Sequence, residues 1–102
     1  MPDWVWACKS GSIEHEDLIR WEHKGRNYAI FRITKGYFCT SGMCTHEEQH
    51  LEDGLVDGEV IECPLHQGRF NVISGKALSA PVCEDLETFP VKVENDDVYV
   101  FV

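Results

Sequence analysis

The segments Cys44-Thr45-His46 and Cys63-Pro64-Leu65-His66 determine how the rest of the chain is interpreted. Each segment offers one thiolate and one imidazole. A [2Fe–2S] cluster needs this combination when two imidazoles replace two thiolates on one of its irons. We therefore predict that the two cysteines bind one iron and that the two histidines bind the other.

The same four side chains also suit a structural zinc ion, which accepts two cysteines and two histidines. Zinc sites more often pair two cysteines in one segment and two histidines in the other. Here each segment mixes one cysteine with one histidine. The grouping favours the iron–sulfur cluster and leaves a zinc site as the alternative.

Glycine and proline are frequent around both segments, which predicts loops. Glycines at positions 42, 54, 58 and 68 allow tight turns. They also let backbone N–H groups approach the cluster sulfurs, and such hydrogen bonds help to set a redox potential. We expect a loop-rich insert that carries the chemistry.

Outside this insert the sequence alternates between short apolar runs and turn signals, a pattern typical of antiparallel β structure. Lys24-Gly25 and Asn95-Asp96 each separate two strand-like runs and predict hairpins. No segment has a useful helical period, and residues 10–17 have room for one short turn only. Strands are expected at residues 4–8, 18–22, 28–33, 37–40, 60–62, 69–72, 91–93 and 98–101.

Composition restricts the class of protein and its partners. The chain has 102 residues, enough for one domain, and a net charge of −9. That charge argues against nucleic acids and anionic membranes, and it favours a partner with a basic docking surface. No apolar stretch is long enough to span a membrane, and the N-terminus lacks the features of a secretory signal. Five cysteines without a disulfide pattern suggest the reducing cytoplasm.

The sequence around the second ligand segment resembles the Rieske family. The similarity rests on the spacing C-x-H, sixteen residues, C-x-x-H, and on residues 62–70, 75–78, 80–82 and 90–95. These segments look most like the ferredoxin components of aromatic-ring dioxygenases, the naphthalene type in particular. The resemblance covers roughly residues 28–102 and is strongest from residue 44 to residue 95.

The resemblance implies an all-β fold, a Rieske-like antiparallel sandwich or barrel with an inserted cluster-binding subdomain. A single domain would comprise a base at residues 1–40 and 84–102 and the subdomain at about 41–83. Near the cluster the resemblance implies shielding or supporting residues: Thr45, Leu65, Gln67, Gly68 and Pro81. Leu65 and Pro81 are expected to shield the cluster from water.

Two departures from the respiratory members of the family imply a low redox potential. Those proteins have a disulfide between the cluster loops, whereas the matching positions here are Gln49 and Leu65. They also donate hydrogen bonds from a serine and a tyrosine, and the matching residues here are Gly68 and Phe70. Fewer donors stabilise the reduced cluster less.

The expected function is that of a soluble electron carrier without enzymatic activity of its own. It would pass single electrons from a flavin-dependent ferredoxin reductase to a terminal oxygenase and act as a monomer. Two alternatives remain open: a redox-sensing or regulatory Rieske protein, and a zinc-stabilised binding module.

Several other residues are expected to have structural roles only. His50 is interpreted as a surface residue of a loop rather than as a ligand. The remaining cysteines are interpreted as buried structural thiols, and the tryptophans as core residues of the base. The acidic residues near the first ligand segment form a solvated face and a weak candidate for partner docking. These residues are Cys8, Cys39 and Cys83, then Trp4, Trp6 and Trp21, and finally Glu47, Glu48, Glu52 and Asp53.

Overall fold

A computed structural model describes residues 1–45, 49–64, 67–79 and 84–102 of the chain. The described part consists of short strands and two single-turn 3₁₀ helices. The elements, in chain order, are β1 (Trp4–Lys9), η1 (Ser10–Ser12), β2 (Asp17–His23), β3 (Arg26–Ile33), β4 (Gly36–Ser41), η2 (Leu51–Asp53), β5 (Leu55–Asp57), β6 (Val60–Glu62), β7 (Arg69–Asn71), β8 (Thr88–Phe89), β9 (Val91–Glu94) and β10 (Asp97–Phe101).

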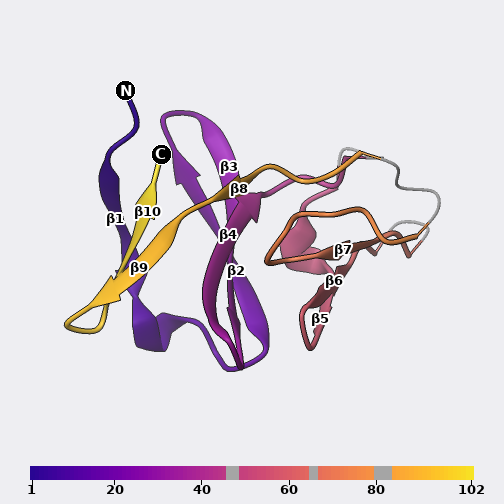
Figure 1. Cartoon of the computed structure of the whole chain (residues 1–102), viewed down its shortest axis with the longest axis horizontal. Helices are drawn as coiled ribbons and strands as arrows, with labels where there is room; N and C mark the ends of the chain where they lie inside the picture. Colours follow the sequence, from indigo (N-terminus) through magenta and orange to yellow (C-terminus); the bar gives the residue numbers. More distant parts are fainter. Residues whose placement is uncertain (46–48, 65–66, 80–83) are drawn as a thin grey trace.

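The strands form three antiparallel sheets, in the orders β1-β10-β9, β2-β3-β4-β8 and β5-β6-β7. Figure 1 shows the sheet that contains both chain ends on one side, the four-stranded sheet in the middle, and the β5-β6-β7 sheet with its loops on the other side. Strands β8 and β9 bring the chain back from the loop-rich side to the terminal sheet. The antiparallel all-β prediction is confirmed.

The central strand β3 has two buried faces, because side chains alternate across a strand. Tyr28 and Ile30 pack in a core with Val98 and Val100 of β10. Ala29 and Phe31 point the other way, into a second core that continues under the β5-β6-β7 sheet. This explains why residues 28–31 at the centre of β3 are continuously apolar: a strand covered on both faces has no solvent side to require polar residues.

Both predicted hairpins are present, and their turns have the backbone that such turns require. Lys24 and Gly25 have φ of +50° and +78° between β2 and β3, and Asn95 and Asp96 have φ of +52° and +66° between β9 and β10. Positive φ at two successive residues is the signature of a type I′ turn, which matches the twist of the flanking strands.

The prediction for two of the tryptophans is wrong. Trp4 and Trp6 are 38% and 51% exposed, because they lie on the outer face of β1 rather than on its core face. Trp4 packs instead against Phe101 at a ring distance of 5.2 Å, and the indole N–H of Trp6 donates to Asp97. Trp21 is partly buried against the core that contains Ile30.

Two short strands, β5 and β8, were not anticipated. Strand β5 has three residues and β8 has two, which is too short for an alternating apolar pattern to be recognised. Among the residues that the structure describes, no helix is long and apolar enough to cross a bilayer.

Candidate metal centre

The first ligand segment lies in a loop of six residues, 44–49, which a single antiparallel bridge closes. Met43 pairs with His50 across the base of the loop, and the Leu51 N–H donates to the Gly42 carbonyl at 2.9 Å. Within the loop the Cys44 N–H donates to the Gln49 carbonyl, also at 2.9 Å. The described residues on the two sides of the first ligand segment are thus held together by backbone hydrogen bonds.

The second ligand segment lies in a loop of the same length, residues 63–68, between β6 and β7. Glu62 pairs with Arg69 at its base, and the Cys63 N–H donates to the Gly68 carbonyl at 2.7 Å. Gln67 has φ of +57°, which turns the chain back toward β7. The two loops are therefore closed in the same way: each begins with a cysteine, whose backbone N–H donates a hydrogen bond to the carbonyl five residues later.

Both cysteines have their side chains in the same core. Cys44 is 5% exposed and Cys63 is fully buried, and both pack in the cluster that includes Leu51, Ile61 and Phe70. Two buried thiols at the mouths of two matching loops fit the thiolate half of the predicted ligand set. This donor chemistry and this common placement are compatible with a [2Fe–2S] cluster.

Close approach of backbone segments holds the loops in place, and two glycines permit it. A Cβ on Gly54 would collide with the Glu62 carbonyl, directly before Cys63. A Cβ on Gly75 would collide with the Leu86 carbonyl, where the Leu86 N–H also donates to Gly75 at 2.7 Å. Larger residues at either position would push apart the segments that surround the ligand loops.

The returning segment at residues 84–87 is tied to the loop-rich side and to the central sheet. The Thr45 hydroxyl donates to the Glu84 carbonyl at 2.8 Å, which joins this segment to the first ligand loop. The Asp85 carboxylate accepts from the Ala77 N–H at 2.8 Å. The Glu87 carboxylate pairs with Arg26 of β3 at 2.6 Å. Sequence reasoning placed Thr45 near the cluster but missed Asp85 and Glu87, because exposed acidic residues in a loop give no local signal of their partners.

Other predicted site residues are only partly accounted for. Gly68 is buried and Gln67 is exposed, both within the second ligand loop. His46, Leu65, His66 and Pro81 lie outside the described residues, as do Glu47, Glu48 and Cys83. The assignment of the four ligands therefore remains a prediction.

The expectation that His50 is a surface residue of a loop needs correction. The residue is partly buried, and its Nδ1 atom is buried with no hydrogen-bond partner among the described residues. Its backbone pairs with Met43 at the base of the first ligand loop.

The two described cysteines outside the ligand loops are buried, as predicted for structural thiols. Cys39 is 2% exposed and Cys8 is 8% exposed. Burial raises the pKa of the Cys39 thiol to about 12, against a smaller opposing effect of the Arg26 guanidinium. Burial also raises the pKa of the Cys8 thiol, while a hydrogen bond with Ser12 acts in the opposite direction. Both thiols are thus held in the unreactive neutral form.

Comparison with protein families gives a match to the Rieske [2Fe-2S] domain over residues 3–90. The chain belongs to this family. The match spans both ligand loops and the sheets that hold them, so the predicted fold class and the predicted cofactor, one Rieske-type [2Fe–2S] cluster, are confirmed. The zinc alternative is not supported.

Individual Rieske proteins of known role are similar to this chain over most of its length. The ferredoxin component of the naphthalene 1,2-dioxygenase system of Pseudomonas putida is 40% identical over 90% of this chain and 88% of that protein. The ferredoxin subunit of biphenyl dioxygenase from Pseudomonas sp. (strain KKS102) is 39% identical, with 92% and 87% covered.

Solved Rieske structures superimpose closely on the chain. A complex of reduced oxygenase and oxidized ferredoxin in carbazole 1,9a-dioxygenase contains a chain that aligns with a TM-score of 0.91 and 34% identity, covering 96% of this chain and 92% of that one. These relatives are electron-transfer components and not catalytic subunits, which agrees with the prediction that this Rieske protein is not an enzyme.

Proposed function

We propose that this Rieske protein is a low-potential electron carrier that serves a terminal oxygenase. The observation that supports this most directly is the pair of matching loops. Each opens with a buried cysteine and contains one histidine two or three residues later. Cys44 and Cys63 would bind one iron, and His46 and His66 the other. When bound, the cluster would accept and release one electron at a time.

The surroundings of the loops support a potential near the low end of the Rieske range. Phe70, which lies just after the second loop, is fully buried, and its side chain has no group that donates a hydrogen bond. Gly68 offers only its backbone. With few donors toward the sulfurs, the extra negative charge of the reduced cluster is poorly stabilised. We expect a midpoint potential of about −150 mV.

The partners follow from the potential and from the relatives. A flavin-dependent ferredoxin reductase would supply the electron, and the oxygenase of an aromatic-ring dioxygenase system would accept it. The chain would act as a monomer in the cytoplasm. Interfaces between such carriers and their partners are small and transient, so the acidic charge of the chain would mainly speed their encounter.

Spectroscopy of the purified protein tests this proposal. We expect two irons and two acid-labile sulfides per chain, and on reduction an EPR signal with the low average g-value of clusters that have histidine ligands. Replacement of His46 or His66 by cysteine should raise that average g-value if these residues are ligands. A colourless protein that holds one zinc ion would contradict the proposal, and a midpoint potential above zero would contradict its low-potential part.

A further inference from the structure

The outward face of the β5-β6-β7 sheet is left uncovered by the residues that the structure describes, and it borders the second ligand loop. Leu55 of β5 pairs with Glu62 of β6, and Glu62 pairs with Arg69 of β7. The Leu78 N–H donates to the Arg69 carbonyl at 2.8 Å, and Ala77 pairs with Phe70, so residues 77–78 lie alongside β7. One row of side chains therefore crosses this face next to the loop.

The ends of this row are exposed and apolar. Leu55 is 65% exposed and Leu78 is 48% exposed, whereas their inward neighbours Val56 and Phe70 are buried. Large aliphatic side chains left in water next to a redox site are typical of surfaces that bind another protein. We call the row of Leu55, Glu62, Arg69 and Leu78 the leucine row.

The centre of the leucine row is an internal ion pair. Arg69 donates to the Glu62 carboxylate through both Nε and a terminal nitrogen, each at 3.0 Å. Beside the row, on the same face of the sheet, lies a shallow hollow of about 90 Å³, lined by Leu55, Asp57, Val60, Glu62 and Arg69. The ion pair neutralises the middle of the face, so a partner that covers Glu62 and Arg69 does not bury an unpaired charge there, and Asp57 remains as the acidic edge of the hollow.

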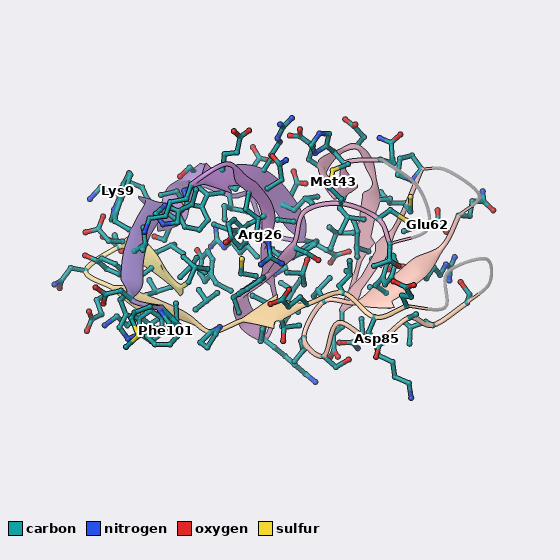
Figure 2. All side chains as sticks on the ribbon, turned by 90° about the horizontal axis from the view of Figure 1, so that it is seen from above. Lys9, Arg26, Met43, Glu62, Asp85 and Phe101 are labelled. Carbon is teal, nitrogen blue, oxygen red and sulfur yellow. The ribbon has the colours of Figure 1, made fainter. Side chains whose placement is uncertain are left out.

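Charge is unevenly distributed along the chain. Residues 42–87 contain ten of the eighteen Asp and Glu residues but only two of the nine Lys and Arg residues. The remaining eight acidic residues share the rest of the chain with seven basic ones. Nearly all of the net charge of −9 therefore lies in the sequence segment that carries the ligand loops, although Arg20, Arg26 and Lys35 from outside it pair with Glu52, Glu87 and Glu59. Figure 2 shows Glu62 and Asp85 of this segment opposite Lys9 and Phe101.

We propose that the leucine row is the docking surface for the terminal oxygenase, whose matching face would be an apolar contact surrounded by basic residues. This inference rests on the proposed function. The acidic segment would orient the carrier with its ligand loops toward a basic surface, and Leu55 and Leu78 would then make the short-range contacts. A partner that binds here contacts the edge of the second ligand loop directly, which keeps the path for the electron short.

The test measures binding of the oxidised, cluster-loaded chain to the oxygenase component of the naphthalene 1,2-dioxygenase system of Pseudomonas putida. Isothermal titration at low ionic strength gives the dissociation constant without electron transfer. The double variant Leu55→Ser, Leu78→Ser should bind about tenfold more weakly, since each side chain loses an apolar contact. Val93→Ser is the matched control, because Val93 is 42% exposed on the terminal sheet, and its affinity should equal that of wild type.

A second pair of variants tests the role of charge. Asp57→Lys, at the hollow, should weaken binding about threefold at low ionic strength, and the difference should vanish at about 0.5 M salt. Glu94→Lys makes the same change of charge in the turn region of β9 and β10 and should bind like wild type.

Each result either supports or contradicts the proposed docking surface. The docking surface is wrong if the red-brown wild-type protein fails to bind this oxygenase, or if the double variant Leu55→Ser, Leu78→Ser binds as tightly as wild type. It is also wrong if Val93→Ser and Glu94→Lys weaken binding as much as their counterparts. A purified chain without two irons and two sulfides would instead contradict the proposed function itself.

Discussion

At the scale of single residues, close packing around the ligand loops depends on positions where a side chain has no room. Gly54 has φ of −89°, an ordinary value, so glycine is needed there for space and not for backbone freedom. The space is missing because the Glu62 carbonyl lies against its α-carbon. Cys63 follows directly after Glu62, the last residue of β6, so a displacement at this point would be transmitted to a predicted ligand.

We therefore expect Gly54→Ala to lower the free energy of unfolding by about 1–3 kcal/mol through overpacking. It should also speed the loss of the cluster on warming, followed by the visible absorbance. Gly11→Ala is the control, because a Cβ at Gly11 meets nothing within 4 Å. Equal stability of the two variants would contradict this explanation.

The buried thiol of Cys39 gives a second prediction at the residue scale. Its pKa is raised to about 12 in the folded chain, while an unfolded chain releases the proton near the ordinary value of 9.0. Between these values the unfolded state binds fewer protons, so folding stability must fall as the pH rises. At pH 10.5 the loss should be about 2 kcal/mol relative to pH 8.

Denaturant unfolding of wild type and of Cys39→Ala at pH 8 and pH 10.5 measures this effect. The variant lacks the thiol, so the stability difference between the two proteins isolates the contribution of Cys39 from that of other groups that titrate in this range. A difference that stays constant with pH would show that the thiol does not titrate as proposed.

At the scale of elements, the fold joins three segments that are distant in sequence. Each ligand loop is closed by its own backbone pairs, at Met43 with His50 and at Glu62 with Arg69. The returning segment at residues 84–87 is tied to the first loop through Thr45. A chain with little regular structure on this side thus obtains its rigidity from hydrogen bonds between loops.

Removing the Thr45 hydroxyl should loosen this connection. Thr45→Val keeps the shape of the side chain but leaves the Glu84 carbonyl without its donor, a loss of about 1 kcal/mol. If this hydrogen bond must break before the wild-type protein can release its cluster, the variant should lose the cluster about fivefold faster. Thr45→Ser retains the hydroxyl and should behave like wild type. The measurement is the decay of the visible absorbance at fixed temperature, and equal rates for the two variants would refute the role of this bond.

At the scale of the whole molecule, the central sheet separates two cores. Ile30 is fully buried in the core shared with β10, and Ile61 is fully buried in the core that contains both Cys44 and Cys63. The two residues are chemically identical and equally inaccessible. They therefore allow a comparison in which only the location differs.

Ile30→Ala and Ile61→Ala should each destabilise the protein by about 2–5 kcal/mol, the usual cost of a cavity. Only Ile61→Ala should also change the midpoint potential and the EPR spectrum, because its cavity adjoins the cysteines. Thermal unfolding, potentiometry and EPR on both variants check this. A shift of potential in Ile30→Ala as large as that in Ile61→Ala would mean that the sheet does not insulate the cluster from the distant core.

Much of the fold could be predicted, because the relevant signals are local. Alternating apolar residues and the pairs Lys24-Gly25 and Asn95-Asp96 identified the hairpins directly. The exposed Trp4 and Trp6 were misassigned, because which face of a strand is covered depends on its neighbours in the sheet. The partial burial of His50 escaped prediction for a similar reason, since the bridge to Met43 is made across a loop.

The sequence by itself determined the chemistry: two thiolates and two imidazoles at a spacing that predicts a Rieske [2Fe–2S] cluster, in an acidic all-β chain. The predicted ligand set depends only on residue type and order, so it can be inferred without coordinates. Only the tertiary structure decided that both loops share one closure, that residues 84–87 are tied to the first of them, and that Leu55, Glu62, Arg69 and Leu78 form one exposed row. Those relations depend on strand register and long-range hydrogen bonds, which bring together residues that no local pattern connects.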